Sequence, residues 1–80
     1  MWYYLKLSRQ TTAVYITPSY VFFDSPQIRY YLSDFAPAVL PYKVSAAYKG
    51  PQGQYLIIYI NGIVHLVIGD NIYNGYLIKP

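Results

Sequence analysis

The sequence contains no cysteine and no glutamate, and His65 is its single histidine. Without thiols the chain can form neither a disulfide nor a thiolate metal site, and one histidine cannot supply a tetrahedral site alone. A chain of 80 residues buries only about 60–65% of the surface that it exposes when unfolded. We therefore expect a thin core that depends on dense aromatic packing, on partner subunits, or on both.

Charged residues are also scarce, at 11% of the chain against about 25% in typical soluble proteins. The six Lys and Arg are scattered along the sequence, and together with three Asp they give a net charge of +3. A run of basic residues would indicate a polyanion site, and the sequence has none.

No targeting or membrane-spanning segment is evident. The N-terminus lacks a basic start followed by an apolar stretch and a small-residue cleavage site. The most apolar stretch, residues 56–68, is shorter than the ~20 residues that span a bilayer, and Asn61-Gly62 interrupts it. We therefore expect no membrane span, and a location in the cytoplasm or in a virion.

Apolar residues, in contrast, are abundant. They make up 55% of the chain, and tyrosine alone occurs 12 times. Tyr, Ser, Thr, Asn, Gln and Gly must then build most of the surface, where soluble monomers carry many charges. Such a surface is better suited to contact with a partner than to isolation.

The strongest local signal is Asn61-Gly62, which lies between two apolar runs, residues 54–60 and 63–68. Both residues tolerate positive φ, as a two-residue type I′ hairpin turn requires. In that register Ile60 lies opposite Ile63 and Ile58 lies opposite His65, and strand alternation defines two faces. One face carries Leu56, Ile58, Ile60, Ile63, His65 and Val67, and the other carries Tyr55, Ile57, Tyr59, Val64, Leu66 and Ile68.

Neither face of this predicted hairpin is polar. An ordinary antiparallel hairpin has one apolar and one solvated face. This hairpin must therefore be covered on both sides, by a helix, a second sheet or another chain. The candidate protein interface is the face that carries Tyr55, Ile57, Tyr59, Val64, Leu66 and Ile68.

The other segments predict one short helix and further strands. After Asp24-Ser25-Pro26, apolar residues recur at the spacing i, i+3, i+4 and i+7, which predicts a helix over residues 25–35. Residues 2–7, 11–17, 20–23, 42–49 and 72–78 have the composition of strands. The expected fold is a single, mainly β domain over residues 1–80. It is a small antiparallel barrel or strongly twisted sheet of about six strands with one short helix.

Residues that carry out acid–base or covalent chemistry are few. His65 is interpreted as a histidine on a largely apolar face with one hydrogen-bond partner. Asp24 is assigned to the start of the helix, Asp70 to a turn, and Asp34 to the solvent face of the helix. Residues 50–53 lack the lysine and the following helix of a phosphate-binding loop. We therefore predict a protein that is not an enzyme, with no cofactor and no metal.

Two functional hypotheses follow. The first is a non-enzymatic structural or interaction subunit of a homo-oligomer or larger assembly, whose partners are copies of itself or other protein subunits. A virus-particle protein of the capsid, decoration or tail type fits this profile, and an inhibitor or toxin-neutralising module has the same signature. The alternative is a small β-barrel that binds nucleic acid through stacking tyrosines and dispersed Lys and Arg. Its candidate residues are Trp2, Tyr4, Lys6, Tyr42, Lys43 and Tyr48.

Overall fold

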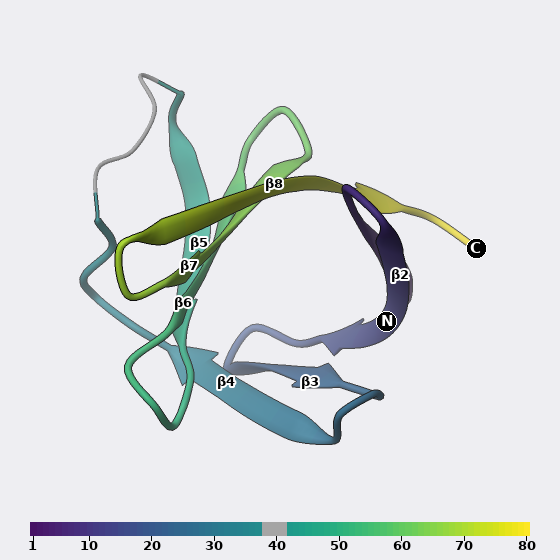
Figure 1. Ribbon diagram of the computed structural model, residues 1–80, viewed down its shortest axis with the longest axis horizontal. Coiled ribbons are helices and arrows are strands. Elements are labelled where there is room, and N and C mark those ends of the chain that lie inside the picture. The colour runs from purple at the N-terminus through teal and green to yellow at the C-terminus, as the bar shows by residue number, and fades with distance from the viewer. Residues whose placement is uncertain (38–41) are drawn as a thin grey trace.

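The computed structural model describes residues 1–37 and 42–80, which fold as a closed antiparallel barrel (Figure 1). Its strands are β1 (Trp2–Leu7), β2 (Gln10–Ile16), β3 (Tyr20–Phe23), β4 (Ile28–Leu32), β5 (Val44–Lys49), β6 (Tyr55–Tyr59), β7 (Ile63–Ile68) and β8 (Asn71–Ile78). Each strand pairs with the next in sequence, and β8 pairs with β1 to close the ring. The prediction of a mainly β, antiparallel fold is confirmed.

The helix predicted over residues 25–35 is wrong, because residues 28–32 form β4 and the described residues contain no helix at all. The apolar spacing there fits a helix, but burial follows a period of two, with Tyr30 buried and its neighbours Arg29 and Tyr31 exposed. Ile and Tyr are also better strand formers than helix formers. Asp24 accordingly lies in the turn between β3 and β4. No helix that could cross a membrane occurs in residues 1–37 and 42–80.

The predicted hairpin exists as β6 and β7, but its register differs by one residue from the expected one. Ile57 lies opposite His65, and Ile58 lies opposite Val64. Three residues, 60–62, connect the strands. The amide of Gly62 donates to the Tyr59 carbonyl at 3.0 Å, and of the turn residues only Gly62 has positive φ. The turn is thus a three-residue loop ending in a left-handed glycine, and not the predicted type I′ turn.

Gly62 offers a direct test of this turn. Its φ is +84°, and a Cβ added there would meet nothing within 4 Å, so a side chain acts through backbone strain alone. Replacing Gly62 with valine is expected to lower the free energy of unfolding by about 1–3 kcal/mol in urea titrations. Gly62→Asn is the matched control and should cost less, because asparagine tolerates positive φ. Equal stability of the valine variant and the parent would show that the turn is misassigned.

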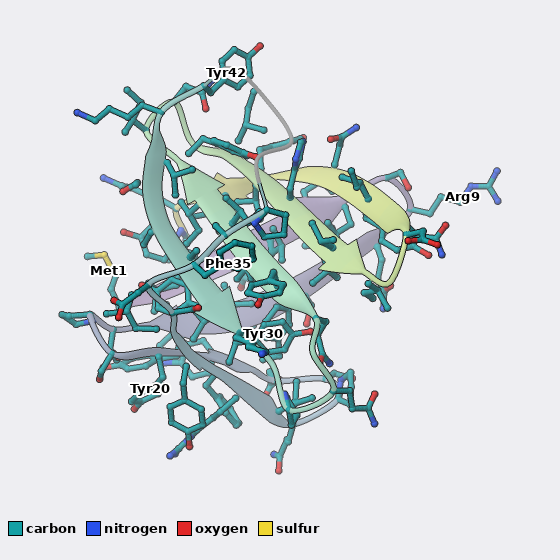
Figure 2. The ribbon with its side chains drawn as sticks, turned by 90° about the vertical axis from the view of Figure 1, so that its left-hand side faces the viewer. Met1, Arg9, Tyr20, Tyr30, Phe35 and Tyr42 are labelled. Carbon is teal, nitrogen blue, oxygen red and sulfur yellow. The ribbon has the colours of Figure 1, made fainter. Side chains whose placement is uncertain are left out.

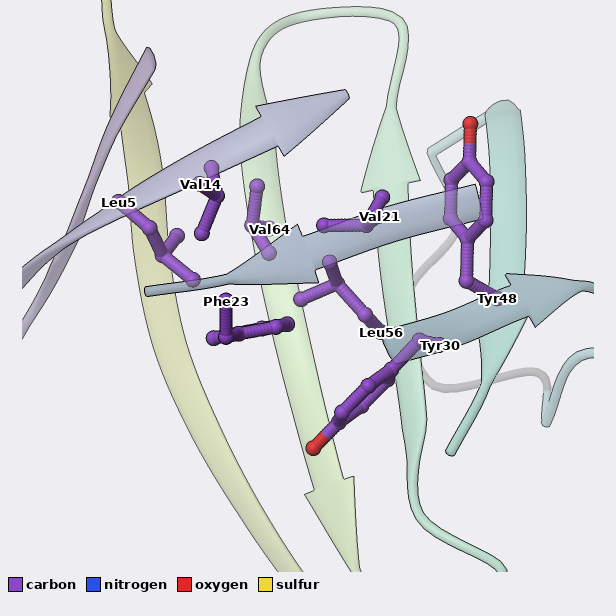
Figure 3. Close-up of a cluster of buried hydrophobic side chains, with 8 residues drawn as sticks. All are labelled: Leu5, Val14, Val21, Phe23, Tyr30, Tyr48, Leu56 and Val64. Atoms are coloured by element: carbon purple, nitrogen blue, oxygen red, sulfur yellow. The ribbon is translucent and has the colours of Figure 1, made fainter. Parts of the chain in front are cut away.

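Strands β1 to β7 each supply buried side chains to the barrel interior. Strand β8 supplies only Leu77, which is half-buried at the edge of this core. Figure 3 shows this inner core, which consists of Leu5, Val14, Val21, Phe23, Tyr30, Tyr48, Leu56 and Val64. One end of the barrel is closed by Tyr48, whose hydroxyl donates to the Thr17 carbonyl at 3.1 Å. This hydrogen bond satisfies the one polar group that Tyr48 carries into the core.

A second apolar cluster lies outside the barrel, on the outer face of β5, β6 and β7. It contains Ala47, Ile57, Tyr59 and Val67 and is packed against Ala36, Tyr55 and Ile63. Residues that follow β4 and residues that precede β5 cover this face (Figure 2). Phe35 packs edge-on against Tyr55 at 5.9 Å, and Tyr42 packs against Tyr59 at 6.1 Å. Both faces of the hairpin are thus covered within one chain.

Candidate functional site

The six residues of the candidate protein interface do not share a surface. Ile57 and Tyr59 are buried in the outer cluster, and Val64 belongs to the inner core. Leu66 packs against the inner core as well, so the one-residue change in register moved β7 residues to the opposite face. Ile68 is 45% exposed at one end of the barrel, and Tyr55 is half-buried beside Phe35.

The candidate nucleic-acid residues are also divided. Trp2, Tyr4 and Lys6 share the outer face of β1, as the alternation of that strand predicts. Tyr42 and Lys43 precede β5 and are exposed, on the part of the chain that covers the outer cluster. Tyr48 is buried inside the barrel, where its ring cannot stack on a base.

Six exposed or partly exposed rings lie on the outer face of β1 to β4, and we call this surface the aromatic wall. It consists of Trp2, Tyr4, Tyr15, Tyr20, Phe22 and Tyr31. Trp2 and Tyr4 are each 45% exposed, and Tyr31 is 57% exposed. Apolar rings with this exposure in one area mark an interaction surface more often than scattered single residues do.

One row of the wall crosses four strands. Trp2 lies opposite Tyr15, Tyr15 lies opposite Phe22, and Phe22 lies opposite Arg29. The Trp2 and Tyr15 rings meet edge to face at 5.3 Å, and the Arg29 guanidinium lies 4.8 Å from the centre of the Tyr20 ring. These five side chains surround a surface recess of about 270 Å³. The cation–π contact keeps the exposed Arg29 side chain beside the rings of the wall.

A second row continues the wall toward β5. Tyr20 lies opposite Tyr31 with ring centres 6.4 Å apart, and Tyr31 lies opposite Lys49. Tyr20 projects outward from the barrel (Figure 2). The Lys49 ammonium lies 5.7 Å from the ring of Tyr55, which borders the outer cluster. The wall therefore extends from β1 to the edge of the covered face.

The charges on this surface have one sign. Strands β1 to β4 contain Lys6 and Arg29 but no carboxylate, and Lys49 follows on β5. The chain's Asp residues all lie outside these strands. The wall thus combines exposed rings with a low density of positive charge.

His65 is buried beside Tyr59 and has one hydrogen-bond partner, as its sequence context predicts. Its Nδ1 lies 3.3 Å from the Tyr59 hydroxyl, and the residue is 3% exposed. Burial raises the pKa of Tyr59, which keeps this hydroxyl protonated as a neutral partner. No group of three metal-ligating side chains occurs in the described parts of the chain. The pair therefore joins β6 and β7 on the outer face of the barrel, where Tyr59 belongs to the outer cluster.

Five residues of this surface were not predicted from the sequence: Tyr15, Tyr20, Phe22, Arg29 and Tyr31. The signal that could have found them is the alternation of rings along residues 2–4, 15 and 20–22, once these segments are placed as neighbouring strands. The false helix over residues 25–35 removed Arg29 and Tyr31 from that comparison.

The chain matched no model of a protein family, no curated protein and no solved structure with which it was compared.

Proposed function

We propose that this chain is a non-enzymatic interaction subunit that joins a larger assembly through its aromatic wall. The observation that carries the proposal is the exposure of Trp2, Tyr4 and Tyr31 beside Arg29 on one face. Trp, Tyr and Arg are the residues that contribute most binding energy at the centres of protein interfaces. Rings also add contact area at a small cost in side-chain entropy.

The closed ring limits how such a partner can bind. Each of the eight strands in the described residues pairs with a neighbour on both sides, and only the β4–β5 pairing is limited to two residue pairs, so few backbone groups are free to add a strand. Contact is therefore expected mainly through side chains. A standard interface removes about 800 Å² from each partner, which a molecule with 5233 Å² of surface can supply from the wall and its borders.

The charge of the wall favours an asymmetric contact. If two copies met wall to wall, Lys6 and Arg29 of one copy would lie in an interface that contains the same cations of the other copy. Like charges placed together in this way are unfavourable. A contact between the wall of one copy and a different face of the next copy avoids this repulsion, and such heterologous contacts build rings or filaments.

A second candidate function is binding of single-stranded nucleic acid, which the Trp2–Arg29 recess favours. Bases stack on exposed rings, and a nearby Arg can contact a phosphate or stack on a base. With three cations in reach, Lys6, Arg29 and Lys49, log K is expected to fall with log salt at a slope of about −2. We rank this candidate second because the positive charge is sparse.

Measurement of molar mass in solution tests the assembly proposal. We expect a mass well above the 9.3 kDa of one chain, decreasing on dilution. The double substitution Tyr4→Ser and Tyr31→Ser should weaken association at least tenfold for each ring removed, because buried Tyr residues are frequent hot spots. Ile72→Ser is the matched control, since Ile72 is 46% exposed on β8, away from the β1–β4 wall.

The alternatives give different results in the same experiment. A parent protein that stays at 9.3 kDa at high concentration would contradict self-assembly. If this monomer also binds single-stranded DNA at micromolar concentration with the expected salt dependence, the second candidate replaces the first. If Ile72→Ser dissociates the assembly as strongly as the double substitution, the interface lies elsewhere on the barrel.

A further inference from the structure

The two ends of the barrel differ. Tyr48 closes one end, whereas the end that carries the β1–β2, β3–β4, β5–β6 and β7–β8 turns opens into a recess of about 400 Å³. We call this recess the mouth. The mouth is lined by inward-facing side chains of β1 to β4 and of β7, together with Gln54 from the loop before β6. Typical small-molecule sites measure about 300–1,000 Å³ and include the mouths of β-barrels.

One polar atom in the mouth makes no hydrogen bond to the protein. Thr12 lies on β2 opposite Leu5 and so points into the barrel, and its Oγ1 is buried without a partner. It is the one such side-chain atom found among the described residues. Buried polar groups are nearly always paired in folded proteins, and each unpaired group is therefore evidence of a further role.

A second polar group faces the same space from a fixed position. The Gln54 side chain lies beside the Tyr30 hydroxyl, and its Oε1 accepts a hydrogen bond from the Gln52 amide at 2.7 Å. Gly50 packs directly on this side chain, since a Cβ at Gly50 would lie 2.6 Å from the Gln54 Cδ. The Gln54 oxygen is thus held by the backbone, and the Tyr30 hydroxyl can donate its proton to an acceptor in the mouth.

The lining of the mouth is uncharged. Leu7, Leu66 and Ile68 supply apolar surface, and none of the side chains that line the recess is Asp, Glu, Lys or Arg. A charged molecule placed there would lose its hydration without gaining a counter-ion, and this is costly. Burial also raises the pKa of Tyr30, so its hydroxyl remains a neutral donor.

We propose that the mouth binds a small uncharged molecule with an apolar body and one hydroxyl or carbonyl group. The hydroxyls of Thr12 and Tyr30 are its hydrogen-bond partners, and Leu66 and Ile68 contact its apolar part. The volume lies near the lower end of the usual range and therefore fits a small ligand. This site is separate from the aromatic wall, whose residues face the opposite side of the same strands.

The probe for this site is 4-ethylphenol, followed by the chemical shifts of the mouth residues in NMR titrations. We expect saturable shifts at Thr12, Tyr30 and Ile68. Ethylbenzene, which lacks the hydroxyl, and 4-ethylbenzoate, which is charged, should each bind at least tenfold more weakly. Thr12→Val keeps the shape of the side chain but removes Oγ1, and it should weaken 4-ethylphenol binding about fivefold to tenfold.

Two further variants make the test specific. Thr11→Val is the matched control, because Thr11 is the neighbour of Thr12 on β2 but is exposed on the outer face, opposite Lys6. It should leave binding unchanged, whereas Ile68→Trp should fill the mouth and abolish binding. Thr12→Val should also raise the melting temperature of the free protein, since it removes an unpaired buried polar group. Equal binding of 4-ethylphenol by the parent and the Thr12→Val and Ile68→Trp variants, or tight binding of 4-ethylbenzoate, would overturn the proposal.

Discussion

Replacing Gly75 with alanine is expected to lower the free energy of unfolding by about 3 kcal/mol. Gly75 lies on β8 opposite Leu7 of β1 and Val64 of β7. A Cβ at this position would lie 2.5 Å from the carbonyl oxygen of Lys6 and 2.7 Å from a methyl group of Leu7. Because the first of these atoms belongs to the backbone, β1 and β8 must separate to admit the methyl group. The loss would be measured by urea unfolding.

The size of this effect is large for so small a domain, whose total stability is about 4–12 kcal/mol for 80 residues. The matched control is Asn74→Ala, since Asn74 precedes Gly75 on the same strand and is exposed. That variant should change stability by no more than about 0.5 kcal/mol. An alanine at position 75 that unfolds with the parent's midpoint would show that β1 and β8 do not approach as closely as described.

Replacing Tyr59 with alanine is expected to cost about 3–5 kcal/mol, the usual range for a buried aromatic residue. The Tyr59 side chain is 2% exposed and contacts the rings of Tyr42 and His65, with centres at 6.1 Å and 5.2 Å. Removal leaves a cavity between the hairpin and the segment that covers it. Thermal and urea unfolding of the purified variant would measure the loss.

Tyr59→Phe separates packing from hydrogen bonding at this position. It keeps the ring and removes only the hydroxyl that lies 3.3 Å from His65 Nδ1, so about 1 kcal/mol should be lost. If the outer face of the hairpin were instead an interface between chains, Tyr59→Ala would release folded monomers with little change in unfolding. That result would contradict the covering of this face by its own chain.

Much of the strand content was predictable because β-rich segments separated by turn residues are a local signal. Residues 2–7 and 20–23 were predicted with the bounds that β1 and β3 have. The helix over residues 25–35 was a different case, because Ile28, Tyr31, Leu32 and Phe35 have helical spacing while the barrel requires Tyr30 to face inward. Contacts with distant strands favour the strand over the helix in this segment, and local sequence preferences do not include those contacts.

The candidate site depended on register, which the sequence specified less well. Asn61-Gly62 is compatible with a two-residue loop and with a three-residue loop. The difference of one residue places Val64 and Leu66 on the inner face of the barrel and Ile63 and His65 on the outer face, the reverse of their predicted pairing with β6. The interface set therefore contained residues that the fold separates. In the nucleic-acid set, Tyr48 faces the inner core on β5, whose pairing with β6 shifts register between Val44 and Ala46. The correct part, Trp2 with Tyr4 and Lys6, depends on alternation within a single strand and needs no register.

The closed ring also has a consequence for how the chain folds. All strand pairs except one join strands that are consecutive in sequence, and most of these pairs close short loops, the longest connection being residues 33–43 between β4 and β5. The remaining pair, β1 with β8, brings together Tyr4 and Ile78 from the two ends of the chain. Loop-closure entropy rises with the length of chain between contacting residues, so this pair is the most costly to form. The expected folding pathway is a meander that grows from local hairpins, with the pairing of the first and last strands as its final step.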